Sequence, residues 1–347
     1  MRQKEVKMKA FYIDEPYCAS VREIDIPVPE DEEVLIKVMA VGVCGTDAHL
    51  YMGDYENPYP TIPGHEFSGV VEAVGKKVKN FTVGQRVAAD PNIYCEACDN
   101  CKQNRQNYCL DYKGLGNQVP GAFQQYMTIH QRCVYDIGNL DFTTASFIEP
   151  LACVIHGHDK ARPDLGDKIL ILGAGPIGLM HLQLCKKDGA ELVAVADIKQ
   201  EQLKLAKELG ADYVIYNDAA AGKEFQKISK DGFNLVIDCT GVPKVIENII
   251  PYLADEGRLL FFGVCPADIK IQVSPYEIYQ RELRFIGSNS LKKTFYAAMR
   301  QLQMGKVKID CLIGNKILLD DLPKYIKAFA EKETKQKIVV YPNGFID

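Results

Sequence analysis

Residues 168–178 read KILILGAGPIG, an apolar run followed at once by a glycine-rich turn. The pattern G-x-G-x-x-G is weak alone, because glycine-rich turns are common. Here it follows a predicted strand and opens a predicted helix, which is the context typical of a dinucleotide-binding site. The sequence therefore predicts that a Rossmann-type βαβ unit begins at this strand.

Each glycine of this turn has its own expected role. Gly173 permits the tight turn, Gly175 lets the backbone approach a pyrophosphate, and Gly178 lets the helix lie close to the strand. The helix begins at Pro176 and Ile177, and a helix N-terminus offers N–H groups and a partial positive charge to phosphates. We therefore expect this turn to bind the phosphates of the dinucleotide.

The next apolar run, LVAVAD, ends at Asp197. A carboxylate at the end of the second strand would accept hydrogen bonds from the adenosine ribose hydroxyls and would repel a 2′-phosphate. The sequence therefore favours NAD over NADP. The alternative role for this carboxylate is the N-cap of the helix that follows, and one carboxylate could serve in both roles.

The chain contains two regions with different sequence patterns. From residue 167 to about residue 286, short apolar runs alternate with amphipathic stretches, which predicts βαβ units and a parallel sheet. In the first 150 residues, β-prone runs such as EVLIKVMAVGV are broken by Gly, Pro and Asn, which predicts a mostly antiparallel, barrel-like domain. The tail has expected helices at 291–304 and 319–331 and a last strand, KIVVYP, that we expect to rejoin the first domain.

Four cysteines lie within the stretch CEACDNCKQNRQNYC at 95–109. The N-terminus shows no apolar signal segment, so disulfides are disfavoured, and a redox pair needs two thiols rather than four. Four thiolates at this spacing are typical of a closed tetrahedral zinc site, which is structural because no coordination position stays open. A nucleic-acid-binding ribbon is the alternative, but this segment has few basic residues. The predicted ligands, in a lobe at 92–112, are Cys95, Cys98, Cys101 and Cys109.

A second set of polar residues interrupts apolar, β-prone segments: Cys44, the pair His65 and Glu66, and Glu149. Each alone has a structural explanation, because a lone cysteine is commonly a small core residue. Mixed sulfur, nitrogen and oxygen ligands with one open position are what a catalytic zinc requires. These residues therefore raise the hypothesis of a second zinc.

The composition excludes several classes of partner. The 347 residues are 47% hydrophobic and 25% charged, as in ordinary folded proteins. The net charge of −5 gives no broad electrostatic reason to bind nucleic acid or anionic lipid. No apolar run reaches the roughly 18 residues that span a bilayer, so we expect no membrane partner and a cytoplasmic location.

The pieces GVCGTDAH, PGHEFSGVV, the four-cysteine lobe, EPLAC and LGAGPIG occur in this order along the chain. Together they resemble the zinc-containing medium-chain dehydrogenase/reductase family, and most closely its polyol (sorbitol-type) and threonine dehydrogenase branch. The resemblance implies an α/β fold with a GroES-like β-barrel catalytic domain at 1–151 and 288–347 and a Rossmann NAD-binding domain at 152–287. It places the active site in the cleft between them, and it implies a homodimer or homotetramer with contacts at Rossmann sheet edges.

The resemblance also implies two zinc ions per chain. Cys44 and His65 would bind the catalytic zinc, with Glu66 as a third ligand and Glu149 binding directly or through the metal-bound water. Which of the two glutamates binds directly stays open. Classical alcohol dehydrogenases place a cysteine at the position of Glu149, so the glutamate favours polyol and threonine enzymes.

Two further residues resemble a proton relay. Thr46 corresponds to the hydroxyl that takes the substrate proton, and His49 to the histidine that passes it to solvent by way of the nicotinamide ribose. The alternative for His49 is a solvent-exposed bystander. The family pattern implies further cofactor contacts at Gln202, Thr240, Val264 and Ser288.

The implied reaction is hydride transfer between a secondary alcohol, a polyol or polyol phosphate, and NAD. L-threonine 3-dehydrogenase and a diol dehydrogenase are the alternatives within this class. The chain departs from the polyol pattern at Leu50, where the family often has a Tyr (Tyr51 is next), at 286–290, which lacks the usual Arg, and at Gln202, which replaces a basic residue. These departures leave the substrate open.

Overall fold

The computed structural model describes residues 7–54, 57–334 and 336–345. The chain divides into two compact units, one up to Ala152 and again from Lys292, and the other from Cys153 to Leu291. We call these unit 1 and unit 2. The expected borders lay at 151/152 and 287/288, so Ser288 falls within unit 2.

Unit 1 is built on one main sheet. Its strands are β3 (Glu33–Gly42), β4 (Glu66–Val74), β5 (Arg86–Ala89), β8 (Tyr126–His130), β9 (Val134–Asp136), β16 (Ile313–Leu318) and β17 (Lys337–Tyr341). Their order is β16-β17-β3-β4-β5-β9, and β8 pairs with β3. The β16–β17 pair is parallel, and the other pairs are antiparallel. A hairpin of β1 (Lys7–Glu15) and β2 (Cys18–Asp25) forms a separate two-stranded sheet.

The core of unit 1 follows from alternation along its strands. On β3, Val34, Ile36 and Val38 are fully buried, while Lys37 between them is only partly buried. The same core includes Phe67 of β4 and residues of β17. The helices of this unit are α1 (Gly45–Met52), α3 (Phe142–Ala145), α10 (Phe295–Gln303) and α11 (Leu322–Ala330), with short 3-10 turns at Gln131–Cys133, Asp310–Leu312 and Leu319–Asp321.

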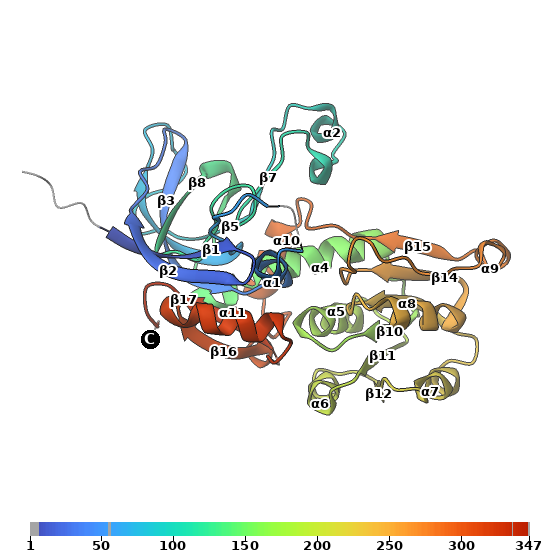
Figure 1. Ribbon diagram of the computed structural model, residues 1–347. Helices are drawn as coiled ribbons and strands as arrows, with labels where there is room; N and C mark the ends of the chain where they lie inside the picture. The colour runs from blue at the N-terminus through green and yellow to red at the C-terminus, as the bar shows by residue number, and fades with distance from the viewer. Residues whose placement is uncertain (1–6, 55–56, 335, 346–347) are drawn as a thin grey trace, which may run out of the picture. The chain divides into compact units, whose positions relative to one another are not determined.

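The four-cysteine segment forms a small lobe of its own. It contains β6 (Asn92–Ile93), α2 (Asp99–Lys102), a 3-10 turn (Gln106–Tyr108) and β7 (Lys113–Gly114), and β6 pairs with β7 (Figure 1). Its packed interior consists of the four cysteines and the rings of Tyr94 and Tyr112. So few apolar residues make a poor core, and a bound metal would add cross-links that packing does not provide.

Unit 2 is a parallel, doubly wound sheet. Its strands are β10 (Lys168–Leu172), β11 (Leu192–Asp197), β12 (Tyr213–Tyr216), β13 (Phe233–Asp238), β14 (Leu253–Phe261) and β15 (Arg284–Gly287). The order is β12-β11-β10-β13-β14-β15, and every pair is parallel. The order reverses between β10 and β13, and ligands of such sheets bind where this reversal occurs.

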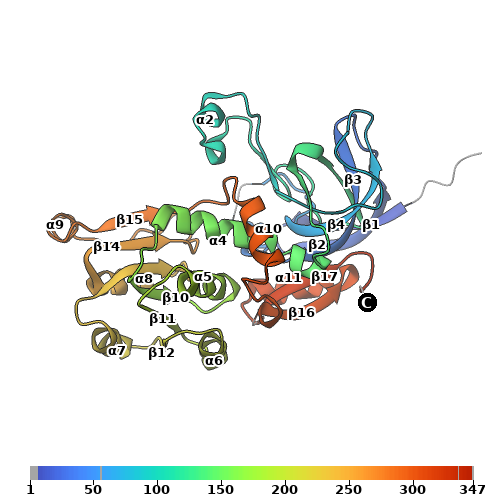
Figure 2. The ribbon, with the colours of Figure 1, turned by 180° about the vertical axis from the view of Figure 1, so that it is seen from behind.

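Helices cover both faces of this sheet. They are the greater part of α4 (Ile148–Ala161), then α5 (Pro176–Lys187), α6 (Gln200–Glu208), α7 (Ala221–Ile228), α8 (Pro243–Ile249) with a 3-10 turn at Ile250–Tyr252, and α9 (Pro275–Gln280). Figures 1 and 2 show α5 and α6 on one side and α7 and α8 on the other. The inner strands β10, β11 and β13 are therefore buried on both faces, as their continuous apolar runs predicted, whereas the edge strands β12 and β15 are mostly exposed or partly buried.

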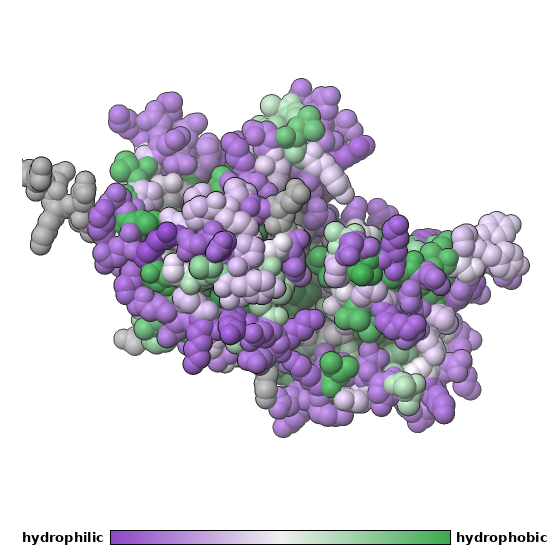
Figure 3. Space-filling model, in the orientation of Figure 1, coloured by the Kyte–Doolittle hydropathy of each residue, from purple (hydrophilic) through white to green (hydrophobic). Residues whose placement is uncertain are grey.

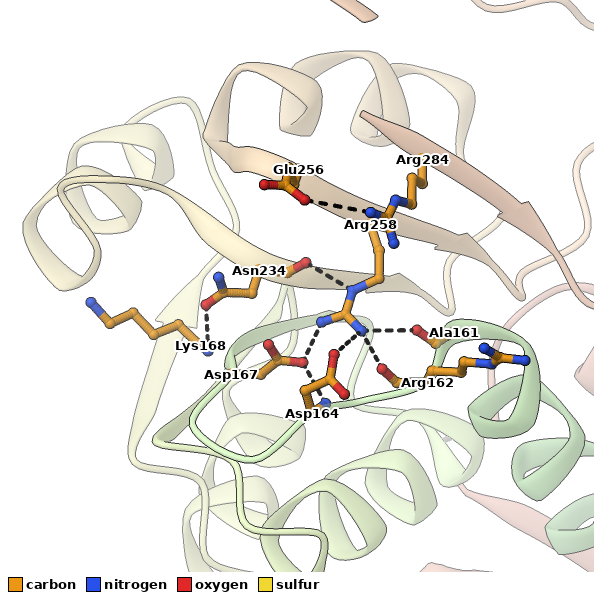
Figure 4. A network of polar contacts seen from close by, with 9 residues as sticks. All are labelled: Ala161, Arg162, Asp164, Asp167, Lys168, Asn234, Glu256, Arg258 and Arg284. Carbon is orange, nitrogen blue, oxygen red and sulfur yellow. Dashed lines mark hydrogen bonds and ion pairs between the residues drawn. The ribbon is translucent and has the colours of Figure 1, made fainter. Parts of the chain in front are cut away.

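A buried arginine connects strand β14 of unit 2 to the end of α4 (Figure 4). Arg258 of β14 donates to the carbonyls of Ala161 and Arg162, where α4 ends, and forms ion pairs with Asp164 and Asp167. Cations are favoured at a helix C-terminus, where carbonyls lack partners within the helix. This network fixes the end of α4 to the sheet.

The structure differs from the sequence prediction in local detail. The stretch after Cys44 was expected to interrupt a β segment but forms α1, and Glu149 lies in the first turn of α4. The expected helix at 291–304 begins only at Phe295, because Lys293 has a left-handed backbone, with φ of 56°. Within the described residues, no helix is both long and apolar enough to span a bilayer.

Candidate metal and cofactor sites

The structure brings Cys44, His65 and Glu66 together. One potential ligand atom from each lies within 4.8 Å of the other two. Cys44 is the N-cap of α1, His65 precedes β4, and Glu66 is the first residue of β4. Two paired strands meet at this cluster, because Gly42 at the end of β3 pairs with Glu66 at the start of β4.

The Glu66 carboxylate is held from one side only. Its Oε1 accepts a hydrogen bond from Lys337 Nζ at 2.7 Å, and its buried Oε2 has no hydrogen-bond partner among the described residues. An ideal Cβ at Gly42 would lie 2.2 Å from that Oε2, so only glycine leaves room for the carboxylate there. A buried, unpartnered carboxylate oxygen next to a thiol and an imidazole fits a cation.

Asp47 links the two ends of this cluster. Its side chain is fully buried and accepts hydrogen bonds from the Cys44 N–H at 2.8 Å and the Gly64 N–H at 3.1 Å. Its Oδ1 also lies 3.8 Å from His65 Nδ1. A carboxylate behind a histidine ligand orients the ring, which is the usual arrangement at protein metal sites.

Charge is concentrated around the cluster. Burial opposes the imidazolium form of His65, but the Cys44 thiolate and the carboxylates of Asp47 and Glu149 raise its pKa well above the usual range. Glu149 is buried near this cluster, although it is not one of the three residues whose ligand atoms lie within 4.8 Å. Several anionic groups in one buried place favour a bound cation.

The two expected relay residues lie on α1. Thr46 Oγ1 is 3.7 Å from Cys44 Sγ, so its hydroxyl lies beside the cluster. His49 is one turn further along, and its Nδ1 lies 2.7 Å from Asp54 Oδ2. Tyr51 is buried and donates its hydroxyl to the Tyr17 carbonyl at 3.3 Å, so its phenol is directed into the protein.

The lobe holds the second cluster of possible metal ligands. Atoms of all four cysteines lie within 4.8 Å of one another. Backbone N–H groups of Leu110 and Cys101 lower the pKa of the Cys98 thiol to about 6, which favours the thiolate that binds metal. Figure 3 shows a small hydrophobic patch on the outside of the lobe, and Leu110 of this lobe is 81% exposed.

The glycine-rich turn of unit 2 has the expected shape. Gly173 has φ of +95° and follows β10, and Gly178 lies so close that a Cβ would be 1.9 Å from the Gly173 carbonyl oxygen. Gly175 is the N-cap of α5, with Pro176 and Ile177 as its first residues, and open space lies where its Cβ would be. The turn thus exposes backbone at a helix N-terminus, as phosphate binding requires.

Asp197 joins this turn to the next helix. Its Oδ2 accepts from the Ala174 N–H at 2.6 Å, and its Oδ1 accepts from the Lys199 N–H at 2.8 Å. The N-cap of α6 is Lys199, so the alternative role of Asp197 as the N-cap is wrong. The carboxylate is instead held at the end of β11, beside the glycine-rich turn.

The other expected cofactor residues lie at the carboxyl ends of neighbouring strands. Thr240 follows β13, and its methyl group would be 3.2 Å from a Cβ on Gly173. Val264 is 63% exposed after β14, and Ser288 follows β15 with a buried Oγ that has no hydrogen-bond partner among the described residues. Gln202 differs, because it is buried in α6 and only 5% exposed.

Comparisons with known proteins agree with this geometry. Residues 30–139 match the alcohol dehydrogenase GroES-like domain, and residues 176–304 match the zinc-binding dehydrogenase domain. D-arabinitol dehydrogenase 1 of Uromyces fabae is 32% identical over 97% of this chain and 98% of its own.

The chain belongs to the zinc-binding alcohol dehydrogenase family.

Solved structures of other dehydrogenases are also similar to this dehydrogenase. A zinc-binding dehydrogenase of Sinorhizobium meliloti bound to NADP has a TM-score of 0.91 and 32% identity, covering 97% of this chain and 100% of that one. An Escherichia coli alcohol dehydrogenase complexed with NADH has a TM-score of 0.90 and 30% identity, covering 96% and 99%. The family, the fold class and the polyol dehydrogenase branch expected from the sequence are confirmed.

Sequence reasoning missed two residues of this dehydrogenase. Lys337 lies 271 positions from its partner Glu66, and no local pattern connects a lysine at the start of a late strand with a distant glutamate. Asp47 was visible within GTDAH, but its role depends on the fold that brings Gly64 to it. A capping-box pattern, an acidic residue three positions after the N-cap, was the available signal.

Proposed function

We propose that this dehydrogenase oxidises a secondary alcohol of a polyol or polyol phosphate with NAD, using one catalytic and one structural zinc ion per chain. The observation that carries the proposal is the convergence of Cys44, His65 and Glu66 on one point, where the buried Oε2 of Glu66 has no hydrogen-bond partner in the described part of the chain. These three residues would hold the catalytic zinc, with Glu149 nearby as a fourth, direct or water-mediated ligand. The four lobe cysteines would hold the other zinc.

Zinc would supply a Lewis acid that lowers the pKa of an alcohol hydroxyl, and NAD would supply the acceptor for the hydride. The chain's own residues handle the proton. Thr46 lies beside Cys44 and would accept the proton of the substrate hydroxyl, and His49 would take it up and release it to water. Asp47 would keep Cys44 and His65 in place during this transfer.

NAD is the proposed cofactor because of Asp197. Its carboxylate stands fixed at the end of β11, where a ribose hydroxyl could donate to it and a 2′-phosphate would meet its negative charge. The relatives with bound cofactor include one with NADP and one with NADH, so the choice in this chain rests on Asp197 itself.

The proposal is tested by a substrate panel followed through the absorbance of NADH. The panel contains polyols, polyol phosphates, vicinal diols and L-threonine, each with NAD and with NADP. Oxidation of a polyol or its phosphate with NAD supports the proposal. Oxidation of L-threonine or of a diol alone would favour L-threonine 3-dehydrogenase or a diol dehydrogenase, and no oxidation by zinc-loaded protein would refute it.

A Thr46→Ala variant tests the relay. Turnover should fall because the Thr46 hydroxyl beside Cys44 is lost, and the zinc content should stay unchanged because Thr46 is not one of the proposed ligands. Full activity of the variant would remove Thr46 from the relay.

A further inference from the structure

The pair of His49 and Asp54 is the feature that the proposed function does not explain. His49 Nδ1 and Asp54 Oδ2 are 2.7 Å apart, which is a short hydrogen-bond distance. His49 is 31% exposed and Asp54 is 49% exposed at the side chain, so both can meet solvent. A histidine that passes protons to water needs such access to solvent.

The end of α1 builds this pair from the backbone. Gly53 has φ of 80°, and the Asp54 N–H donates to the His49 carbonyl at 3.0 Å, which are features of a Schellman-type helix end. A Cβ at Gly53 would lie 2.7 Å from Pro16 Cγ, so the close approach of Pro16 also requires glycine. The chain therefore turns back and directs Asp54 to the His49 ring.

We propose that Asp54 is a positioning residue that fixes which nitrogen of His49 handles the proton. This inference rests on the proposed function. With Asp54 accepting from Nδ1–H, the neutral imidazole keeps its lone pair on Nε2, and that nitrogen accepts the proton that leaves the substrate hydroxyl. The proton then passes from Nε2 to water, so His49 returns to its first state. The Asp54 carboxylate stabilises the imidazolium formed between these two steps.

Other titratable groups also lie near α1. β1 and α11 pack against α1, and Glu331, which follows α11, acts electrostatically on Tyr51, as does the Cys18 thiol of β2. Burial and the charge of Asp54 raise the pKa of the Tyr59 phenol. Asp54 is in hydrogen-bond contact with His49, so its removal changes this contact directly.

The experiment compares Asp54→Asn with Asp31→Asn. Asp31 forms an exposed ion pair with Lys77 at 3.3 Å, and its substitution makes the same charge change away from α1. For Asp54→Asn we expect kcat to fall roughly 3- to 30-fold with KM nearly unchanged, because the general base is less well oriented. Asp31→Asn should change neither kcat nor KM.

Two further measurements separate a positioning role from a structural one. In the His49→Asn background, Asp54→Asn should cost no further activity, because residues that act through one another are not additive. In ¹⁵N NMR of the zinc-loaded protein, His49 should show the Nδ1–H form, and Asp54→Asn should shift its two nitrogens toward the Nε2–H form. Asp31→Asn is the control for both.

The outcomes decide each inference separately. If the wild type oxidises alcohols and Asp54→Asn behaves like Asp31→Asn in rate and NMR, the positioning role is overturned. If no alcohol is oxidised but NMR finds the Nδ1–H form lost in Asp54→Asn, the orientation of His49 by Asp54 is supported and the proposed function fails. If NMR finds His49 in the Nε2–H form in the wild type, the assignment is wrong whatever the activity.

Discussion

Lys337 Nζ lies 2.7 Å from Glu66 Oε1, and the side chains of both residues are at least nine-tenths buried. Lys337 begins β17 and Glu66 begins β4, so the ion pair joins two strands that are not neighbours in the sheet. Lys337 also donates to the Val43 carbonyl at 3.2 Å, directly before Cys44. Lys337 therefore holds in place one candidate metal ligand, Glu66, and the backbone next to another, Cys44.

Replacing Lys337 with Met should destabilise the protein by roughly 3 kcal/mol, because removal of one partner leaves a buried charge unpaired. Lys9→Met is the matched control, since Lys9 forms an exposed ion pair with Asp320 at 2.6 Å, and it should cost about 1 kcal/mol or less. Urea unfolding at equal metal content measures both. Equal effects of the two substitutions would show that Glu66 does not depend on Lys337.

Removing one thiol from each cluster should separate the two proposed zinc ions. Cys98→Ser should lower the zinc content from two to one per chain and reduce thermal stability and solubility, because the lobe has little core of its own. Cys44→Ser should also lose one zinc, but it should abolish turnover while the melting temperature changes little. Metal analysis and thermal unfolding of the purified variants test this. A Cys98→Ser protein that is stable yet inactive would assign the lobe a part in catalysis.

The sequence determines unit 2 most directly. LVAVAD became β11 at Leu192–Asp197, and the glycine-rich turn lies between β10 and α5 as expected, because a strand buried on both faces and a phosphate-type turn are local patterns. In unit 1 the signal was weaker. Along β16 every second residue is buried or partly buried, but one of these inward positions is Asn315, so the sequence IGNKIL itself shows no clear period.

The candidate metal sites were predictable for a different reason. Cysteine, histidine and glutamate are chemically distinctive, so Cys44, His65 and Glu66 could be selected before their geometry was known. Lys337, which supports Glu66, and Asp54, which contacts His49, could not be selected in this way, because lysine and aspartate are common surface residues. Lys337 and Asp54 became informative only once the fold placed each beside its partner.

Asp197 should control the choice between the two nicotinamide cofactors. Asp197→Ala should raise the Kd for NAD roughly tenfold, through loss of a charge-assisted hydrogen bond, and should lower the Kd for NADP relative to NAD. The substitution also removes the acceptor for the Ala174 and Lys199 N–H groups, so Asp197→Asn, which keeps one carbonyl oxygen, is the control for local structure. Both variants should discriminate less against NADP in binding titrations. An unchanged ratio of the two Kd values would refute the ribose contact.

Asp90 should make stability depend on pH. It is 6% exposed, and burial raises the pKa of its carboxyl to about 6, although hydrogen bonds from Asn92 oppose the shift. Since the usual value is 3.8, the folded protein holds this proton more tightly than the unfolded chain. Its contribution to the unfolding free energy is therefore complete below about pH 4 and is lost as the pH rises through about 6.

Asp90→Asn keeps a carbonyl oxygen for the Asn92 N–H groups but cannot ionise. The variant should therefore match the wild type near pH 4 and exceed it by on the order of 2 kcal/mol at pH 7. Urea unfolding of both proteins across this range measures the difference, and groups that titrate alike in the two proteins cancel from it, the cysteine clusters included. Asp31→Asn, at an exposed site, should show no such trend. A constant difference between Asp90→Asn and the wild type at all pH values would mean that the Asp90 carboxyl has the same pKa in the folded protein as in the unfolded chain.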